Sequence, residues 1–190
     1  PLIADEMLPL INEDIEHLLK LQNSIVLMLE ADRDVHQAVI AEKMALVASE
    51  DAEVQAADQG NAENIQQARD RMAKASVAFD SPEAKKLYGE FQTAFADWEE
   101  KSRGVIEMAN TPGKLQFARK ASDTGSALTT FNAMRDLIDQ LQQVQTRDVE
   151  TILAGVEAKK AKINQQEQGI GDKKKAVVDT YSATESKAST

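Results

Sequence analysis

The stretch that decides the fold runs from Leu10 to Gln59 and reads LINEDIEHLLKLQNSIVLMLEADRDVHQAVIAEKMALVASEDAEVQAADQ. It contains no glycine or proline, and its apolar residues mostly recur at intervals of three and four, which places them on one face of an α-helix. They are Ile11, Ile15, Leu18, Leu19, Ile25, Val26, Leu29, Val35, Val39, Ile40, Met44, Val47 and Val54. We therefore predict a first helix over about residues 8–59, roughly 75 Å long at 1.5 Å per residue, that ends at Gly60.

The composition of the whole chain also favours helices. Of its 190 residues, 42% are hydrophobic but only 4% are aromatic, and there are 8 Gly and 4 Pro. A β-sandwich or barrel needs aromatic and β-branched residues and frequent turns, whereas alanine, glutamine, glutamate, aspartate and lysine are typical of long helices. The sequence predicts an all-α protein.

Two shorter helices are predicted next. The first covers about residues 61–79. Ser81, Pro82 and Glu83 then provide an N-cap, a proline at the first helical position and an acidic first turn, which together start a new helix. This middle helix is predicted over about residues 82–110.

A second long helix is predicted after the turn Asn-Thr-Pro-Gly at 110–113. It covers about residues 114–165, and Gly125 within it is expected to weaken the helix without necessarily breaking it. After Ile163 the apolar spacing fades. Residues 166–190 are therefore predicted to be a frayed helix or a disordered polar tail.

The lengths of these helices predict how they pack. The first and last helices are long, the middle two are short, and tight turns force sequential helices to lie antiparallel. Residues 1–165 are thus predicted to form one elongated antiparallel up-down-up-down four-helix bundle with both chain ends at the same pole. The apolar stripe from Ile11 to Leu29 would need further cover, which a second copy could supply. We therefore expect a homodimer.

Charge and residue usage exclude several classes of function. The formal net charge is −10, so the surface repels phosphate and no nucleic-acid partner is expected. The absence of cysteine removes disulfides and thiolate chemistry. His17 and His36 lie too far apart on one helix to share a metal, and no His-x-x-x-His or Glu-x-x-His pair occurs. No metal site and no cofactor are predicted.

Catalytic motifs are not found either. The chain has no G-x-S-x-G nucleophile motif and no glycine-rich phosphate loop. Its many carboxylates are what this composition places on solvated helix faces. We therefore predict no enzyme activity and no catalytic residues.

The ends of the chain suggest a fragment of a membrane protein. The sequence begins at Pro1 without an initiator methionine, which predicts an excised piece of a longer protein. No stretch approaches the ~20 apolar residues that cross a bilayer. A bundle with both ends at one pole has the shape of an extracytoplasmic loop between two transmembrane helices. Contact with a membrane is expected only through such flanking helices, outside this sequence.

Three segments resemble one protein family. Residues 29–38, Leu-Glu-Ala-Asp-Arg-Asp-Val-His-Gln-Ala, resemble the A-D-R-D-x-x-Q-A signature in the first helices of bacterial methyl-accepting chemotaxis receptors with four-helix-bundle sensor domains. Residues 64–71 resemble the N-I-x-Q-A-x-x-R stretch of that family, and residues 131–139 resemble its F-x-x-M-R-x-x-I-D stretch. Met-Leu-Pro at 7–9 resembles the residues just after the first membrane span. The resemblance covers roughly residues 1–160.

This resemblance implies a function and a location. It implies a dimeric ligand-sensing domain in the periplasm, belonging to a receptor of the bacterial inner membrane. In the full receptor a signal-converting linker and a cytoplasmic methylated coil would follow. The ligand would be a small polar molecule such as an amino acid, an amine or an organic acid.

One polar cluster is a candidate ligand site. Aligning the two long helices from their turns, with Asp58 beside Lys114, predicts that Arg33 lies near Asp139. The same alignment places Gln37 near Arg135, under the pair of short helices. The candidate residues are Asp32, Arg33, Asp34, Gln37, Arg135, Asp136 and Asp139.

Two interpretations of this cluster remain open. Arginine can hold a carboxylate and aspartate an ammonium group, so the cluster suits a small zwitterion or an amine. Charged groups partly buried between helices also pair with one another, so the same residues suit an ion-pair network that fixes the helix register.

The function also has an alternative. The leading hypothesis is an extracytoplasmic chemoreceptor sensor domain that transmits a small helix shift across the membrane. The alternatives are a non-enzymatic helical scaffold or adaptor, and the ectodomain of a histidine kinase.

Overall fold

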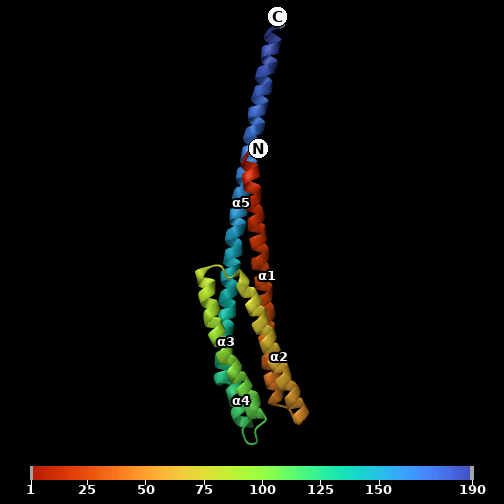
Figure 1. Cartoon of the computed structure of the whole chain (residues 1–190), viewed down its shortest axis with the longest axis vertical. Helices are drawn as coiled ribbons and strands as arrows, with labels where there is room; N and C mark the ends of the chain where they lie inside the picture. Colours follow the sequence, from red (N-terminus) through yellow and green to blue (C-terminus); the bar gives the residue numbers. More distant parts are fainter. Residues whose placement is uncertain (1, 189–190) are drawn as a thin grey trace. The chain divides into compact units, whose positions relative to one another are not determined.

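The computed structural model describes residues 2–188, with side chains described for residues 7–183. Within residues 2–188 there are helices and turns but no strand, which confirms the all-α prediction. Figure 1 labels the helices of the chain, which divides into two units. The larger unit is Leu19–Asp148, and the smaller unit combines Pro1–Leu18 with Val149–Thr190.

Five α-helices and one 3₁₀ turn account for the described chain. They are α1 (Leu2–Ala45), α2 (Asp51–Ala75), the 3₁₀ turn η1 (Ser76–Ala78), α3 (Pro82–Ala109), α4 (Leu115–Asp123) and α5 (Ser126–Ala188). The helices α1 and α5 each contribute residues to both units.

The first helix is shorter at its carboxyl end than the sequence predicts. Helix α1 ends at Ala45 rather than near residue 59, and residues 46–50 form a turn before α2. The carboxylate of Glu53 accepts hydrogen bonds from the backbone N–H groups of Ser49 (2.8 Å) and Glu50 (3.3 Å). These bonds satisfy donors that a helix start leaves free. Gly60 consequently lies inside α2 and ends no helix.

The start of α3 follows the local signals in the sequence. The Ser81 hydroxyl accepts a hydrogen bond from the Ala84 backbone N–H at 3.2 Å, and Pro82 occupies the first turn. The helix then runs to Ala109, within one residue of the predicted end. The preceding short helix differs from its predicted span of 61–79, because α2 begins ten residues earlier, at Asp51.

The predicted fourth helix, 114–165, is two helices. Helix α4 ends at Asp123, and α5 begins at Ser126. A Cβ atom added to Gly125 would lie 2.9 Å from the Ala121 Cα and 2.9 Å from the Lys120 carbonyl oxygen. The chain therefore turns too tightly here for a larger residue, and glycine permits the break.

Of the two states predicted for the tail, helix and disorder, the structure has helix. Residues 166–188 continue α5 as helix, where a frayed helix or disordered tail was predicted for 166–190. Its described side chains are almost all exposed, which explains why no apolar periodicity marked it. Alanine, lysine, glutamine and glutamate favour helix without a core face. The last two residues, 189–190, lie outside the described chain.

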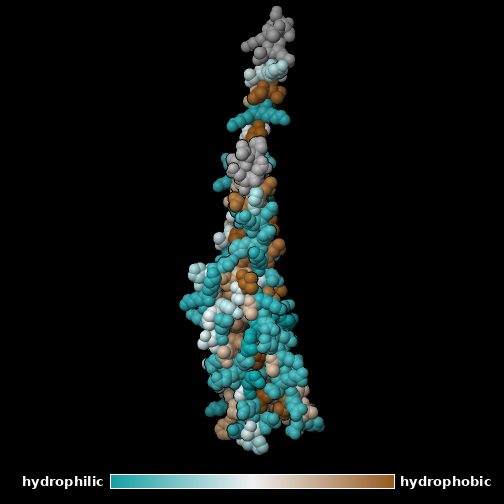
Figure 2. Space-filling view, in the orientation of Figure 1, coloured by the Kyte–Doolittle hydropathy of each residue, from teal (hydrophilic) through white to brown (hydrophobic). Residues whose placement is uncertain are grey.

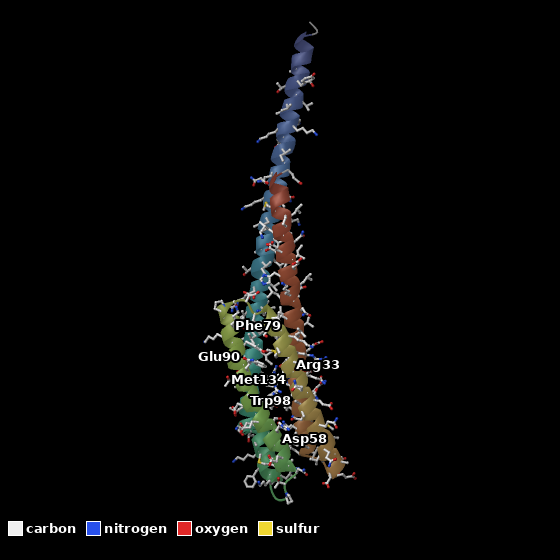
Figure 3. All side chains as sticks on the ribbon, in the orientation of Figure 1. Arg33, Asp58, Phe79, Glu90, Trp98 and Met134 are labelled. Carbon is white, nitrogen blue, oxygen red and sulfur yellow. The ribbon has the colours of Figure 1, made fainter. Side chains whose placement is uncertain are left out.

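One hydrophobic core holds the larger unit together. Helix α1 contributes Met28 and Val35, and the facing side chains come from α2, α3 and α5. Trp98 of α3 and Met134 of α5 are completely buried in it, and Figure 3 shows both between the helices. The core includes many alanines, which allow helix backbones to approach closely. These are Ala31, Ala38, Ala68, Ala75 and Ala84.

Aromatic rings form a continuous series through this core. Phe91, Phe95 and Trp98 lie on one face of α3, with ring centroids 5.4 and 5.5 Å apart. Trp98 then contacts Phe131 of α5 at 5.6 Å. Such contacts add to the burial of apolar area. The structure thus places Trp98 in the core.

The smaller unit is thinly packed. None of its described side chains is buried. Asp14 of α1 accepts a hydrogen bond from the Lys159 ammonium group of α5 at 2.5 Å, and both side chains are about a quarter exposed. Ile11, Val156 and Ile163 are each half-buried within it. This unit therefore has little hydrophobic core of its own.

Candidate functional site

The candidate cluster contains one close ion pair between α1 and α5. The guanidinium of Arg135 donates from Nε to Asp32 Oδ1 at 2.7 Å and from its terminal nitrogen to Asp32 Oδ2 at 3.3 Å. This two-point geometry is the strong form of an arginine–carboxylate contact. Both side chains remain partly exposed, at 30% and 24%. The pair is therefore within reach of solvent.

A histidine and a phenylalanine complete this pair. His36 Nδ1 lies 2.8 Å from the Asp32 carbonyl oxygen and 3.7 Å from Asp32 Oδ2. Its ring meets Phe131 edge-on at 5.3 Å, and the Arg135 guanidinium lies 5.9 Å from the same ring. A cation over an aromatic ring is attracted by its π-electrons. Asp32, His36, Phe131 and Arg135 thus form one group, here called the α1–α5 pair site.

The electrostatics of this group favour a permanently charged arginine. The hydrogen bond from Arg135 to Asp32 raises the pKa of the guanidinium, and the negative charges of Asp32, Asp139 and Asp136 act in the same direction. Asp136 and Asp139 are exposed on α5. Their negative charges act on Arg135 from a distance, whereas Asp32 is hydrogen-bonded to it.

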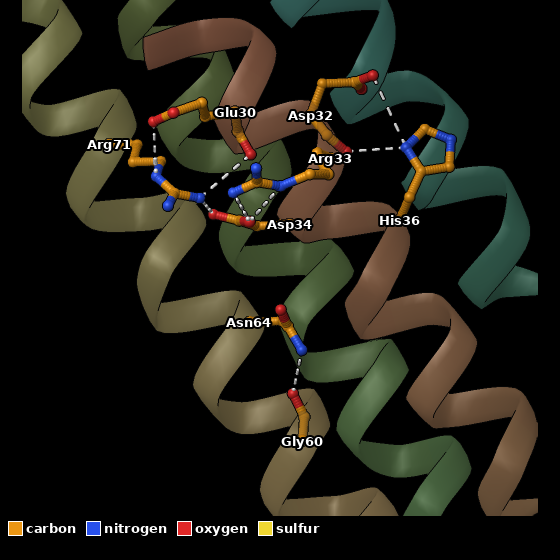
Figure 4. Close-up of polar contacts among 8 residues, drawn as sticks. All are labelled: Glu30, Asp32, Arg33, Asp34, His36, Gly60, Asn64 and Arg71. Atoms are coloured by element: carbon orange, nitrogen blue, oxygen red, sulfur yellow. Dashed lines mark hydrogen bonds and ion pairs between the residues drawn. The ribbon is translucent and has the colours of Figure 1, made fainter.

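Asp34 belongs to a different group, on the α2 side of α1. Its side chain is fully buried and accepts hydrogen bonds from Arg71 of α2 and from Arg33 at 3.2 Å (Figure 4). Arg71 also lies 3.2 Å from the Glu30 carboxylate. A buried carboxylate is stable only when it is paired and hydrogen-bonded. This buried Asp34–Arg71 pair fixes α2 against α1.

The predicted cluster is therefore two clusters, and its register was wrong. Arg135 lies beside Asp32, five positions before its predicted neighbour Gln37. Arg33 bonds to Asp34 rather than lying near Asp139, and Figure 3 shows it on α1 near α2. Gln37 is exposed. The alignment failed because α1 ends at Ala45 and α5 starts at Ser126, so the two helices do not share the assumed turn level.

Sequence reasoning also missed a buried polar layer, formed by Glu42 (α1), Asn61 (α2), Ser102 (α3) and Ser122 (α4). Each is at most 3% exposed. Ser102 donates its hydroxyl to Glu42 Oε2 at 2.6 Å, and Ser122 donates to Glu42 Oε1. Asn61 Nδ2 donates to the Ser102 hydroxyl at 3.0 Å and to the Ala38 carbonyl oxygen at 2.9 Å.

The pKa of Glu42 reflects this layer. Burial raises it above its ordinary value, and the hydrogen bonds from Ser102 and Ser122 oppose that effect. A sequence signal existed, because Glu42 lies four residues after the core residue Ala38, on the buried face of the helix. The pattern of apolar positions alone does not reveal it, since the hydrogen-bond partners of Glu42, Ser102 and Ser122, lie 60 and 80 residues away in the sequence.

Among the described residues, no three histidine, cysteine, aspartate or glutamate side chains lie together in a way that would hold a metal ion. Across the same residues, no helix combines the length and the apolar character needed to span a membrane.

Comparison with known proteins identifies no relative. No family model matches this sequence. No curated protein and no solved structure matches it either.

Proposed function

We propose that this chain is the extracytoplasmic sensor domain of a transmembrane chemotaxis receptor in a bacterial inner membrane. In this proposal the domain lies in the periplasm, binds a small polar ligand as a homodimer and carries no catalytic activity. An up-down-up-down arrangement of two long and two short helices is part of the proposal. The basis is the resemblance of residues 29–38, 64–71 and 131–139 to that receptor family.

One structural observation supports the proposal most directly. The α1–α5 pair site lies beside a stripe of exposed residues on α1, and His36 belongs to both. The stripe is spaced alternately by four and three, as in a coiled-coil seam. Its members within the larger unit are Leu19, Gln22, Val26, Leu29, Arg33, His36 and Ile40.

The exposure of this stripe favours a second copy as its cover. Leu19, Val26, Leu29 and Ile40 are each between 52% and 60% exposed. Figure 2 shows one face of the molecule, and its lower part is mainly hydrophilic with apolar patches among the polar residues. A seam with a heptad spacing and polar residues at single positions is complementary to itself across a two-fold axis.

The chemistry of the pair site suits an amino acid, an amine or an organic acid. Arg135 can exchange Asp32 for a ligand carboxylate, and Asp32 or the exposed Asp136 can then accept an ammonium group. Differential binding to two packings of α1 against α5 would shift their relative position by ~1–2 Å. Such a shift is the signal in this proposal.

The ligand site is tested by titration calorimetry against a library of amino acids, amines and organic acids. Arg135→Ala should abolish binding of whichever compound binds. Arg69→Ala is a matched control, because Arg69 also pairs with a carboxylate, Glu99, and lies 5.4 Å from a phenylalanine ring, Phe95. A ligand held equally well by Arg135→Ala and by the wild type would remove this site.

The homodimer is tested separately by sedimentation equilibrium. Leu29→Glu should weaken association at least tenfold, because a charge replaces an apolar seam residue. Val77→Glu is the control, since Val77 is 82% exposed and lies outside α1. A wild type that stays monomeric at millimolar concentration would refute the seam. Apolar segments of ~20 residues flanking this region in its gene would support the membrane topology.

A further inference from the structure

We propose that Glu42 is a proton-binding site inside the larger unit. Its carboxyl is uncharged when the polar layer is packed, and loss of the proton loosens α3 and α4 from α1. The inference rests on the geometry of the layer and does not depend on the proposed function.

The first argument is burial without a counter-ion. Glu42 is 2% exposed, and its hydrogen-bond partners are the hydroxyl groups of Ser102 and Ser122. The nearest basic side chain along the helix, Lys43, donates to Asp123 of α4 at 2.5 Å. A buried carboxylate without a paired cation is strongly disfavoured, and such groups bind a proton instead.

The second argument concerns hydrogen-bond capacity. An ionised carboxylate has about four acceptor sites, and the hydroxyls of Ser102 and Ser122 fill two of them. The remaining donor in the layer, Asn61 Nδ2, is engaged by the Ala38 carbonyl and the Ser102 oxygen. A protonated Glu42 needs fewer donors, because it can give its own proton to one serine oxygen and accept from the other.

The third argument is the charge on every helix around Glu42. Helix α1 contributes Lys43, and α4 contributes Asp123, so these two charges act on Glu42 in opposite directions. Arg119 of α4 donates to the Leu46 carbonyl oxygen at 3.2 Å. Helices α2 and α3 present the uncharged Asn61 and Ser102. The charges of Lys43 and Asp123 therefore oppose each other and affect the pKa of Glu42 less than its burial does.

Burial accordingly raises the pKa of Glu42 above its ordinary 4.5. The folded protein then holds a proton that the unfolded chain releases. The contribution of Glu42 to stability is fully present below its unfolded pKa and is lost as pH rises from about 4.5 through its folded pKa. Above the folded pKa the loss is complete and the stability curve becomes flat.

Helix α4 is the element that we expect ionisation of Glu42 to affect most. It is nine residues long, and of its side chains only Ala118 and Ser122 are buried. Ser122 is bound to Glu42. An ionised Glu42 would draw water into the layer and weaken the link to α4 through Ser122, which leaves the contacts of Lys43 with Asp123 and of Arg119 with Leu46 between α1 and α4. The proton thus controls how firmly α4 packs.

Thermal unfolding of Glu42→Gln and the wild type from pH 4.5 to 8.5 tests the proposal. The amide keeps the size of the carboxyl but cannot ionise. The melting temperature of the wild type should fall relative to the variant by about 3–5 °C per unit of pKa elevation. Glu107→Gln, at an exposed position, should follow the wild type. A variant less stable than the wild type at pH 8 would overturn the proposal.

Two further measurements separate a proton from a metal cation at this site. Carbon-13 NMR of the carboxyl that disappears in Glu42→Gln should show titration above pH 4.5, and Ser122→Ala should move the midpoint higher, because that hydroxyl lowers the pKa. Titration at or below 4.5 would refute protonation. Melting temperatures in sodium, potassium and choline chloride should agree, and stabilisation by sodium alone would identify a cation site instead.

Discussion

Replacing Arg71 with alanine should expose how much the buried Asp34–Arg71 pair contributes. The Asp34 side chain is fully buried and the Arg71 side chain is 23% exposed. After the substitution only Arg33 remains near Asp34, through bonds of 3.2 and 3.4 Å, and its own side chain is 53% exposed. The Asp34 carboxylate would remain buried, with the free-energy cost of its desolvation, but it would lose Arg71, its closer partner.

The magnitude follows from that partial compensation. Removing one partner of a fully buried pair costs about 3–5 kcal/mol. Arg33 offsets part of this loss, so we expect a cost of about 2–3 kcal/mol. In a chain of this size that lowers the melting temperature by roughly 5–10 °C. Circular dichroism at 222 nm, monitored on heating, measures it.

A second substitution, at Asp34 itself, tests whether the buried charge causes this loss of stability. Asp34→Asn should destabilise the wild type, because it weakens the contact with Arg71. In the Arg71→Ala background it should stabilise, because it removes an uncompensated buried charge. Arg69→Ala, which breaks a more exposed pair with Glu99, should cost under ~1 kcal/mol. Two results would refute this role of the pair. One is an Arg71→Ala variant that loses no more free energy of unfolding than Arg69→Ala, and the other is an Asp34→Asn change that destabilises the wild type and the Arg71→Ala variant equally.

Two other substitutions test single features of the fold. Both polar atoms of the buried Gln145 amide lack a partner within the described chain. Gln145→Leu should therefore raise the free energy of unfolding, measured by urea denaturation, by about 1–2 kcal/mol. A loss of stability would contradict this prediction. Ser81→Ala should lower the free energy of unfolding by about 1 kcal/mol, because the hydroxyl caps α3, whereas Ser81→Asp should retain most of the stability.

The sequence predicted the helical class and the start of α3 because both depend on local chemistry. Ser81, Pro82 and Glu83 act within one turn, and helical periodicity is visible along any single helix. The turn at 46–50 was missed because it contains no glycine or proline. Its signal is the carboxylate of Glu53, which bonds back to Ser49 and Glu50. Glutamate is common inside helices, so the sequence alone does not distinguish that role.

The candidate site was half predictable for a similar reason. The residue types were right, since Asp32 and Arg135 do pair. Their neighbours depend on the register between α1 and α5, which depends in turn on the end of α1 at Ala45 and on the break between α4 and α5, neither of which was predicted. Arg71 was missed because its partner, Asp34, is 37 residues away on another helix. Burial turns an ordinary pair of charges into a specific contact, and burial is a property of the packed core.

Buried polar contacts help to set the register between α1 and α2. Small core residues such as Ala31 and Ala68 resist a one-turn slide less than large side chains do. Polar links do not tolerate that slide: the Ser24 hydroxyl donates to the Ala75 carbonyl at 2.9 Å, Asp34 pairs with Arg71, and Asn61 donates to the Ala38 carbonyl. As the α1 number rises the α2 number falls, so the helices run in opposite directions. Sliding by one turn would strand these groups in an apolar core, at a cost of about 1–3 kcal/mol for each neutral group. The hydrophobic core supplies stability, and these few buried polar groups help to select the observed alignment of α2 along α1.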